Sequence, residues 1–469
     1  MELNTDIEAL RAKLSQCDQE HVLGFWADLD PVEQTRLLTE LNSLDLDELS
    51  TILGGEDKKI DFSEMASRAS APPAVRADGT GADWTVEAAR ARGEEALLGG
   101  EVGAVIVAGG QGTRLGFDQP KGMYRIGPVS DRTLFQFFAD RLLAINEAYG
   151  CRVPLYLMTS EATDQETRDY FEANDYLGLN RDDVVIFKQG TMPAVDASTG
   201  KLLLAGRDKL ALSPDGHGGT VTALERHGCL RDAASRGVKY LAYIQVDNPL
   251  ANLCDPTLLG HHILSASEMT TQVVRKRYAT EKVGNVVLVD GQVQIIEYSD
   301  LPDEAAEAVD DQGDLKLWAG NIAVHVFDVD FLRRMSRESA ALPFHRASKK
   351  VPYVNDAGDL IQPNEPNATK FERFIFDLLP AAKNAFVVEA SPRDAFAPVK
   401  NADGAAADTP ALAREAISNL HLGWLKQADA WVGEGVQVEI NPRFALSAEA
   451  LQKKIGPNLR IESDRYFDA

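Results

Sequence analysis

The sequence lacks the features that mark secreted, zinc-bound or membrane-spanning proteins. Only four of its 469 residues are cysteines, and no two of them form a CxxC pair. Scattered thiols of this kind argue against a disulfide framework or a zinc site and indicate reduced cysteines in the cytosol. No apolar run reaches the roughly 18 residues of a membrane span, and the N-terminal MELNTDIEALRAK has no apolar signal core. We therefore expect a cytoplasmic protein without a membrane partner.

Positive charge is also scarce. The chain has 48 Lys and Arg residues against 72 Asp and Glu residues, which gives a net charge of −24. This excess of negative charge argues against nucleic acid or an acidic membrane surface as the main partner. A polyanionic substrate would have to bind in a local cationic pocket within an acidic protein. No protein partner can be inferred from the sequence.

The most informative stretch is VGAVIVAGGQGTRLGFDQPKGMY, which runs from Val102 to Tyr124. It opens with β-branched apolar residues, which predict a buried parallel strand. Gly109, Gly110 and Gly112 follow within four positions. Glycines let the backbone turn tightly and bring its N–H groups close to an anion, which is usually phosphate. The stretch therefore predicts a phosphate-binding loop at the end of a strand.

Two cations follow these glycines. Arg114 can grip phosphate oxygens with its planar fork, and Lys121 is a compact point charge directly after Pro120. The simpler alternative is a glycine turn whose two cations are only solvated. The spacing matches neither a Walker A loop nor the GxGxxG fingerprint, because Leu115 would occupy the place of the third glycine. We interpret the stretch as a polyphosphate site of another kind.

Strands alternate with helices from residue 102 to about residue 391. Strands are predicted at 102–107, 154–160, 184–187, 240–246 and 271–277, and helices at 133–149, 163–174 and 221–236. This alternation implies right-handed βαβ units and a doubly wound α/β sheet. Ligands bind at the carboxyl ends of the strands in such sheets. Gly109, Gln189 and Asp247 each come just after a predicted strand, so we expect them to converge.

The chain flanking this region has a different texture. Its length favours two or three domains. We divide it into a helical N-terminal region with a linker at 1–95, a central α/β domain at 96–402 and a small C-terminal lobe at 403–469.

Two more positions could bind a nucleotide. SPDGHGG, at 213–219, is a second glycine-dense loop before a helix, whose N-terminus offers further N–H donors, although plain Asp-Gly turns are common. Asp247 follows an apolar strand and could bind Mg²⁺, which takes one or two carboxylates together with phosphate oxygens and water. Alternatively, Asp247 caps the next turn, although Asn248 suits that role better.

The words GGQGTRLG and PKGMY resemble the signature of eukaryotic-type UDP-sugar pyrophosphorylases, specifically the UDP-N-acetylhexosamine branch. The resemblance continues through VDN, EYS, AGN and KNAD, in matching order over roughly residues 95 to 455. It implies a Rossmann-like mixed sheet of the nucleotide-diphospho-sugar transferase type, with 96–402 as the catalytic domain. It also implies UTP and a sugar 1-phosphate as substrates and Mg²⁺ as the cofactor.

The same resemblance assigns roles to individual residues. Arg114 and Lys121 would hold the triphosphate and act in catalysis, and Asp247 would bind the metal. The uracil-binding positions would be Val107, Ala108, Gly109, Gly110, Gln189 and Gly216. The sugar would meet Glu297, Tyr298 and Asn321, whose amide offers both a donor and an acceptor. Lys370 and Lys400 would contact phosphates.

Lys370 belongs to a cluster with Lys349, Lys350 and two aromatic residues, Phe374 and Phe376, on one predicted helix. The resemblance places these aromatic residues near the sugar. The alternative interpretation is that the phenylalanines are core residues and the lysines are solvated.

The choice of sugar depends on His217. An Asn usually stands at this position in the UDP-N-acetylhexosamine branch, whereas DGHGG resembles the loop of UDP-glucose pyrophosphorylases. Four words against one favour N-acetylglucosamine 1-phosphate as the substrate, with glucose 1-phosphate as the alternative. A non-catalytic UDP-sugar-binding protein is a further alternative, but Arg114, Lys121 and Asp247 are all present. A glycosyltransferase would typically have a DxD pair, whereas Asn248 and Pro249 follow Asp247.

Overall fold

The structure is a computed structural model that describes residues 2–54, 61–338, 342–456 and 458–469. These residues form two compact units, each assembled from three separate segments. Unit 1 comprises 1–60, 189–219 and 342–375, and unit 2 comprises 61–188, 220–341 and 376–469.

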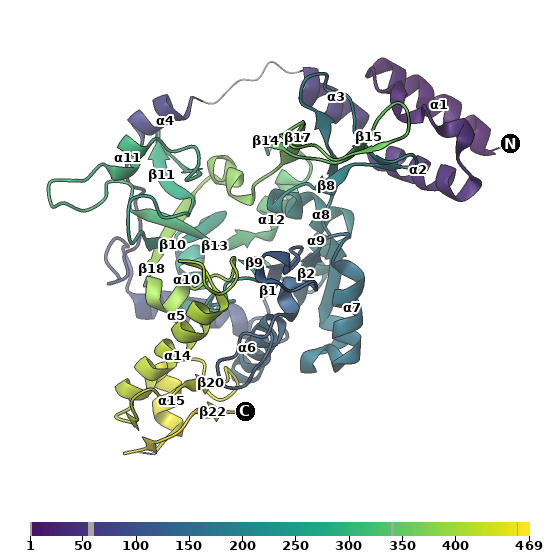
Figure 1. The fold of residues 1–469 in the computed structure, drawn as a ribbon. Coiled ribbons are helices and arrows are strands. Elements are labelled where there is room, and N and C mark those ends of the chain that lie inside the picture. The colour runs from purple at the N-terminus through teal and green to yellow at the C-terminus, as the bar shows by residue number, and fades with distance from the viewer. Residues whose placement is uncertain (1, 55–60, 339–341, 457) are drawn as a thin grey trace. The chain divides into compact units, whose positions relative to one another are not determined.

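Unit 2 is built on a nine-stranded mixed sheet (Figure 1). Its strands are β1 (Val102–Val107), β2 (Leu155–Thr159), β3 (Val184–Lys188), β9 (Tyr240–Gln245), β10 (Met269–Arg275), β11 (Asn285–Val289), β12 (Gln292–Ile296), β13 (Ala319–Asp328) and β18 (Ala385–Ala390). The order is β12-β11-β13-β9-β1-β2-β3, and β10 pairs with both β13 and β18. β1 is parallel to β9 and β2, and β2 is parallel to β3, whereas β13 is antiparallel to β9. The predicted α/β sheet is confirmed.

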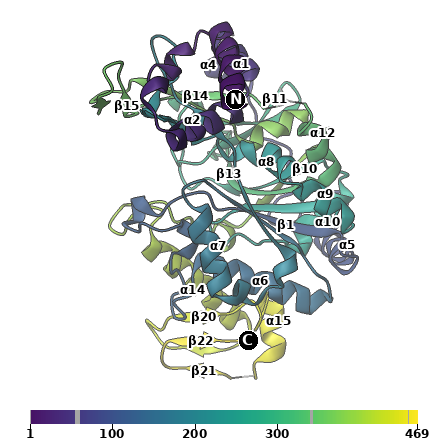
Figure 2. The same ribbon diagram turned by 90° about the vertical axis from the view of Figure 1, so that its right-hand side faces the viewer.

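Helices cover both faces of this sheet (Figure 2). The helices of unit 2 are α4 (Phe62–Arg68), α5 (Val86–Leu98), α6 (Leu134–Tyr149), α7 (Asp164–Ala173), α8 (Thr220–Arg226), α9 (Cys229–Ser235), α10 (Pro256–Leu264), α11 (Asp303–Glu307), α12 (Val329–Met335), α13 (Pro392–Ala395), α14 (Pro410–Gln427) and α15 (Ala448–Lys454). On one face, Ile106 shares a core with Phe138 of α6 and Leu258 of α10. On the other, the Tyr156 hydroxyl donates to Asp232 of α9 at 2.7 Å.

The prediction of one helix over 221–236 was wrong. The chain forms α8 and α9 instead, and Gly228 between them has a φ of +73°. This left-handed conformation favours glycine and breaks the helix.

The C-terminal residues add a small subdomain to unit 2. It contains the short strands β19 (Trp431–Val432), β20 (Val438–Ile440), β21 (Arg460–Ile461) and β22 (Arg465–Phe467). Leu425 of α14 and Leu451 of α15 share its hydrophobic cluster with Val438 and Phe467.

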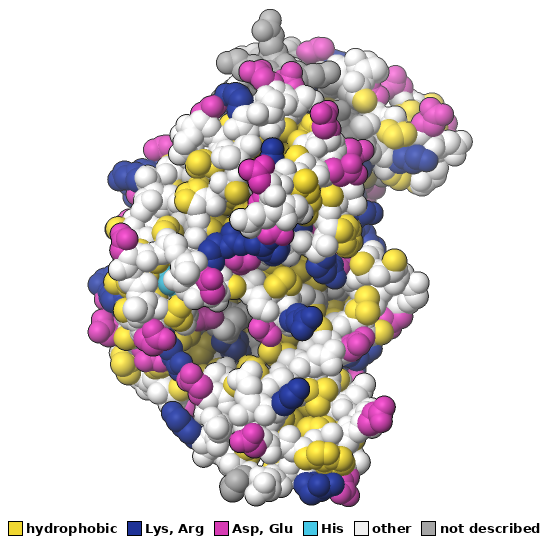
Figure 3. Space-filling view, turned by 90° about the vertical axis from the view of Figure 1, so that its left-hand side faces the viewer, with side chains coloured by type: hydrophobic (Ala, Val, Ile, Leu, Met, Phe, Trp, Pro, Cys, Tyr) yellow, Lys and Arg dark blue, Asp and Glu magenta, His cyan; other side chains and the backbone are white. Residues whose placement is uncertain are grey.

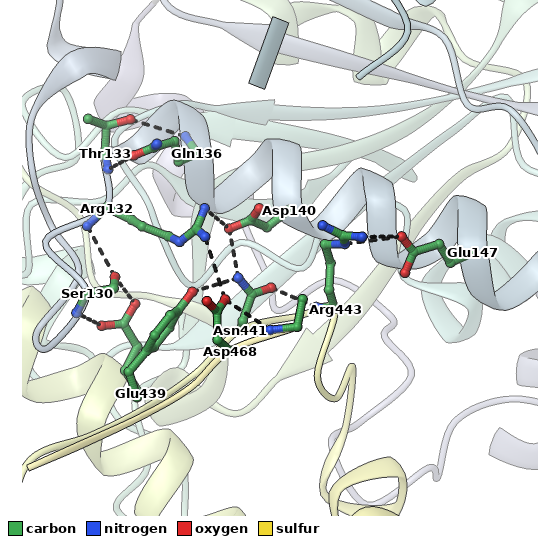
Figure 4. Close-up of polar contacts among 12 residues, drawn as sticks. Ser130, Arg132, Thr133, Gln136, Asp140, Glu147, Glu439, Asn441, Arg443 and Asp468 are labelled. Atoms are coloured by element: carbon green, nitrogen blue, oxygen red, sulfur yellow. Dashed lines mark hydrogen bonds and ion pairs between the residues drawn. The ribbon is translucent and has the colours of Figure 1, made fainter. Parts of the chain in front are cut away.

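A polar network joins this subdomain to α6 and the loop before it (Figure 4). The Glu439 carboxylate accepts from the N–H and the hydroxyl of Ser130, at 2.7 and 2.5 Å. Asn441 donates to Asp140 of α6 at 3.1 Å. Arg132 forms an ion pair with the same Asp140 at 2.8 Å. The attachment is therefore partly polar and buried, because Asp140 is only 5% exposed.

Unit 1 combines N-terminal helices with small β-elements. Its helices are α1 (Glu2–Gln16), α2 (Pro31–Ser43) and α3 (Leu46–Gly54). Its strands are β4 (Thr191–Pro193), β5 (Val195–Asp196), β6 (Leu204–Gly206), β7 (Lys209–Leu210), β8 (Leu212–Pro214), β14 (His345–Lys349), β15 (Tyr353–Val354), β16 (Leu360–Ile361) and β17 (Ala368–Glu372). Leu37 and Leu41 of α2 share a core with Leu210 and Phe371. The helical pattern predicted near the N-terminus is present.

Asp140 predicts a pH dependence of stability. Burial raises the pKa of this carboxyl to about 6, and Arg132 only partly opposes that effect. The folded protein therefore binds a proton more tightly than the unfolded chain, so this contribution to stability is lost as pH rises through about 6. Between pH 4.5 and 7 this effect should lower the free energy of unfolding of the wild-type protein by on the order of 2 kcal/mol. Asp140→Asn should abolish that decrease, measured by chemical unfolding. An equal pH dependence in the wild-type protein and the variant would contradict this assignment.

Candidate functional site

The loop after β1 folds back on itself. The Gly112 N–H donates to the Gln119 carbonyl at 2.9 Å, and the Lys121 N–H donates to the Gly110 carbonyl at 3.0 Å. The loop therefore returns Lys121 to the point where the glycines begin. Gly109, Gly110 and Gly112 are not left-handed, so their conformation does not require glycine. Instead, a Cβ on Gly110 would meet only Lys121 Cε, 4.0 Å away, which leaves that space open.

The two predicted cations differ in their surroundings. Arg114 lies in a short 3-10 helix, Thr113–Leu115, and is exposed. Among the residues that the structure describes, its side chain has no ion pair or hydrogen bond. The Lys121 side chain is 17% exposed, and its Nζ lies 3.4 Å from the Asp247 carboxylate. Arg114 is thus available to a solvent-borne anion, while Lys121 already faces a carboxylate.

Lys121 owes its position partly to Gly122. A Cβ on Gly122 would lie 2.1 Å from the ring of Phe135, which begins α6 with Leu134. Only glycine lets the backbone approach the ring this closely. Packing against Phe135 therefore explains the glycine of the PKG motif, in addition to the charge that Lys121 supplies.

Asp247 follows β9, the strand next to β1, so Asp247 and Gly109 emerge at the same edge of the sheet. Its backbone carbonyl accepts from the Val399 N–H at 2.8 Å, directly before Lys400. The Asn248 amide donates to the Ala395 carbonyl at 2.8 Å and accepts from the Ala397 N–H at 3.0 Å. These bonds join the segment carrying Lys400 to the segment carrying Asp247.

Asn248, predicted as a capping residue, has a structural role instead. Its side chain is 3% exposed and bonds a segment about 150 residues away rather than the following turn. A second missed residue is Asp408, whose carbonyl accepts from the Lys400 N–H at 2.8 Å. No sequence signal marks either contact, because both partners are distant or backbone groups.

The donor set at Asp247 fits a hard divalent cation that takes most of its ligands from elsewhere. Within the described ranges, no group of three or more His, Cys, Asp or Glu side chains could hold a metal. One carboxylate is a common protein contribution to Mg²⁺, which keeps waters and binds substrate phosphates. The residues present therefore fit Mg²⁺ carried in with a polyphosphate.

The predicted sugar-side residues lie beside this edge of unit 2. β13 is antiparallel to β9, and His325 of β13 pairs with Tyr243 of β9. Asn321 precedes His325 in the chain, so it lies toward the end of β9 that Asp247 follows. Asn321 Oδ1 accepts from the Ala323 N–H at 3.0 Å, which directs the amide NH₂ elsewhere as a donor. Glu297 follows β12 and is half-buried, whereas Tyr298 is 47% exposed.

The second glycine loop belongs to unit 1. The segment of unit 1 that contains this loop begins at Gln189, which directly follows β3. Gly216 has a φ of +82°, and a Cβ on it would lie 2.4 Å from the Arg373 carbonyl. That carbonyl accepts from the Gly218 N–H at 2.8 Å, and the Arg373 N–H donates to the Asp215 carbonyl at 2.8 Å. The loop is thus clamped against residues 372–374.

His217 is held in one orientation by this clamp. Its ring stacks on Phe374, with centroids 5.3 Å apart, and its Nδ1 lies 3.2 Å from the Ile375 N–H. Burial lowers the pKa of His217 to about 4, with a smaller effect from His345. The ring is therefore neutral near pH 7. Because Nδ1 accepts from a backbone N–H, the proton lies on Nε2.

The predicted helix around Phe374 was wrong. Lys370 lies in β17, opposite Ala347 of β14. Phe374 lies between β17 and a short 3-10 helix, Ile375–Ala381, which contains Phe376. Phe376 is 5% exposed, as the core interpretation requires, while Phe374 stacks on His217.

The predicted site residues are therefore divided between the units. Unit 2 brings Gly109, Gly110, Lys121 and Asp247 together and carries Lys400 on a segment bonded to Asp247. Unit 1 carries Gln189, Gly216, His217 and Lys370. On the face in Figure 3, Lys and Arg side chains gather near the middle among scattered acidic ones, so the negative net charge is not spread evenly.

The chain is similar in sequence to proteins of one known family. A sequence model of the family described as UTP–glucose-1-phosphate uridylyltransferase matches residues 84–428. The human UDP-N-acetylhexosamine pyrophosphorylase-like protein 1 is 38% identical over 446 residues, which cover 90% of this chain and 86% of the human protein. The UDP-N-acetylglucosamine pyrophosphorylase of Saccharomyces cerevisiae is 39% identical over 368 residues, 77% of each chain.

A solved structure is similar over nearly the whole chain. The uridine diphosphate N-acetylglucosamine pyrophosphorylase from Trypanosoma brucei, in complex with an inhibitor, has a TM-score of 0.83 and 25% sequence identity. The match covers 98% of both chains. In the part of this chain that the structure describes, no helix has the length and apolar character needed to cross a bilayer.

The clamp on His217 predicts how this residue titrates. Its ¹³Cε1–H signal should stay constant from pH 8 to about pH 5 in histidine-labelled protein, because its pKa is lowered to about 4. The His217→Asn variant identifies the signal by its loss. A midpoint near 6.5, the ordinary value, would show that the ring is solvated.

Proposed function

The chain belongs to the UTP–glucose-1-phosphate uridylyltransferase family, and from this premise we propose that it joins UTP and N-acetylglucosamine 1-phosphate. The products are UDP-N-acetylglucosamine and pyrophosphate. The protein is a nucleotidyltransferase, and its relatives with 38–39% identity are named for N-acetylhexosamine or N-acetylglucosamine pyrophosphorylases. We propose residues 96–402 as the catalytic domain and the cytoplasm as the compartment.

The observation that supports this proposal most directly is the cluster at the ends of β1 and β9. Lys121 and Asp247 lie 3.4 Å apart there, and the exposed Arg114 is carried on the same loop as Lys121. A cation pair beside one carboxylate suits a triphosphate and its counterion. A non-catalytic UDP-sugar-binding protein could have lost Arg114, Lys121 or Asp247, and all three are present.

The reaction needs positioning and charge neutralisation rather than a base. An oxygen of the sugar 1-phosphate, already anionic near neutral pH, attacks the α-phosphorus of UTP. The new P–O bond forms as the bond from the α-phosphorus to the β-bridging oxygen breaks, and pyrophosphate leaves with the electron pair. We assign Arg114 and Lys121 to the triphosphate and to the charge that develops on it. Lys370 and Lys400 are assigned to phosphates.

Mg²⁺ is assigned to Asp247. When bound, it would neutralise phosphate oxygens and polarise the phosphoryl group. Asp247 would hold it, and Lys121, which already lies near this carboxylate, would turn its ammonium to a phosphate oxygen.

The base and the sugar are assigned to separate residues. We propose that the backbone of Val107, Ala108, Gly109 and Gly110, with Gln189 and Gly216, contacts uracil. Glu297, Tyr298 and Asn321 are proposed for the sugar, where the amide NH₂ of Asn321 suits an acetamido carbonyl. His217 adds a neutral Nε2–H donor, which suits either this carbonyl or a hydroxyl.

Asp247→Asn tests the metal assignment. The substitution keeps the size of the side chain but removes the charge that a hard cation needs. It should raise the Mg²⁺ concentration required for half-maximal activity by at least about tenfold and lower the maximum rate by about 100-fold. Asp330→Asn, a change at a side chain that is 96% exposed on α12, is the matched control. An unchanged Mg²⁺ titration would leave Asp247 with a purely structural role.

The proposed substrate is tested by pyrophosphate release from UTP with N-acetylglucosamine 1-phosphate and glucose 1-phosphate. The wild-type protein should prefer the first in kcat/KM by at least tenfold, about 1.4 kcal/mol. His217→Asn should increase that preference, because Asn can still accept from the Ile375 N–H but is less bulky.

A tenfold preference for glucose 1-phosphate would instead support the glucose alternative, which the DGHGG loop favours. UDP-sugar binding without turnover of either sugar phosphate would refute the proposed enzyme.

A further inference from the structure

A buried lysine outside the proposed catalytic set lies at the end of β10. Lys276 is 5% exposed. Its Nζ donates to Asn285 Oδ1 at 2.6 Å and to the Ala279 carbonyl at 3.3 Å. The nearby Glu281 is bonded to Arg277, at 2.7 Å from its Nε, and within the described ranges Lys276 has no ion pair of its own.

Such an arrangement is costly. A buried ammonium without a paired carboxylate loses hydration that neutral carbonyls only partly replace. Burial accordingly lowers the pKa of Lys276, although Glu281 opposes the shift. A charge kept in this position at this cost is expected to serve a purpose that an apolar residue could not.

The position of Lys276 points to the hairpin formed by β11 and β12. β11 is attached to β13 through one ladder pair, Asn285 with Gly320, and through the Asn321 N–H, which donates to the Gly284 carbonyl at 2.8 Å. Near its turn, the hairpin is held separately by an antiparallel β-bridge between Ser70 and Leu288. The end that carries Glu297 therefore depends on a narrow junction, which lies at the edge of the sheet (Figure 1).

The Asn285 side chain bonds both the residue that follows β10 and the last residue of β12. Its Oδ1 accepts from Lys276, and its Nδ2 donates to the Ile296 carbonyl at 3.2 Å, one residue before Glu297. The charge-assisted bond from Lys276 fixes which way the amide faces, because only the oxygen can accept from an ammonium. This side-chain pair thereby holds the backbone just before Glu297, and the backbone of Asn285 pairs with Gly320, just before Asn321.

We propose that Lys276 and Asn285 are positioning residues that hold the hairpin so that Glu297 and Asn321 meet the sugar 1-phosphate together. This inference rests on the proposed function and goes beyond it, because neither residue touches substrate. The pair should control affinity for the sugar phosphate and not for UTP, whose proposed contacts lie on β1 and β9. Selectivity for the sugar would then depend on a buried ammonium that does not itself contact the sugar.

The test compares Lys276→Met with the wild-type protein. Met has a similar length but neither charge nor donor. The KM for N-acetylglucosamine 1-phosphate should rise at least tenfold, while the KM for UTP stays within twofold. Hydrogen exchange should accelerate at Gly284, Asn285 and Glu297 but not in β1. Lys282→Met, at an exposed lysine of the same segment, is the control and should change nothing.

Variants of Asn285 separate positioning from general stability. Asn285→Ala leaves the ammonium without its acceptor and should reproduce the effect of Lys276→Met, and combining the two should add little. Asn285→Asp supplies a carboxylate for the ammonium but loses the donor to the Ile296 carbonyl, so it should fold and still raise the KM for the sugar phosphate. If Lys276→Met does not fold, Asn285→Ala and Asn285→Asp carry the test.

The positioning role and the uridylyltransferase activity are refuted by different results. Equal increases in both KM values, or no change in either, would overturn the positioning role while leaving the uridylyltransferase activity intact. A wild-type protein that does not turn over sugar phosphates would overturn the proposed function, and unchanged hydrogen exchange at the hairpin in Lys276→Met would then overturn the positioning role as well.

Discussion

The parallel pairing of β1 with both β9 and β2 is the constraint on which the site depends. Each of these strands ends at the same edge, so the loops that follow them are forced into proximity regardless of their separation in sequence. Gly109 and Asp247 are 138 positions apart and lie on neighbouring strand ends for this reason. The loop after β1 then returns Lys121 to the same place through its bond to Gly110. Proximity here is a property of the sheet rather than of any one side chain.

Buried polar contacts add the accuracy that a sheet alone cannot provide. Asn248 bonds the segment before Lys400, and Asn285 bonds the strand before Glu297. An amide suits both places because it can donate and accept at once without bringing a charge into the core. Each contact also carries a penalty if one partner is removed, since a buried group left unsatisfied loses its hydration. The residues proposed to bind substrate are thus oriented by neighbours that need not touch a ligand.

Histidine 217 illustrates how surroundings change the meaning of a residue type. In sequence it is a bulky, titratable replacement for an expected Asn. In the structure its ring is stacked on Phe374 and bonded to a backbone N–H, and burial keeps it neutral. Its surroundings therefore suit a fixed donor rather than a pH-sensitive group. The acetamido and hydroxyl alternatives differ in shape and direction, and not in whether they can accept a hydrogen bond from it.

The amino-acid sequence alone predicted the strand-and-helix alternation, the α/β class and a glycine loop at the end of the first strand. These follow from local periodicity, β-branched runs and glycine spacing, which act over a few residues. It did not reveal that Lys370 would lie in a strand, since tertiary contacts override weak local preference. The break at Gly228 has a local cause, the left-handed conformation of a glycine, which the helical periodicity of 221–236 concealed. The association of 189–219 and 342–375 with the N-terminal helices, the bond of Asn248 to Ala395 and the pairing of Lys276 with Asn285 were decided only by the tertiary structure. Such contacts join groups that are distant along the chain, and their geometry depends on the packing of every element between them.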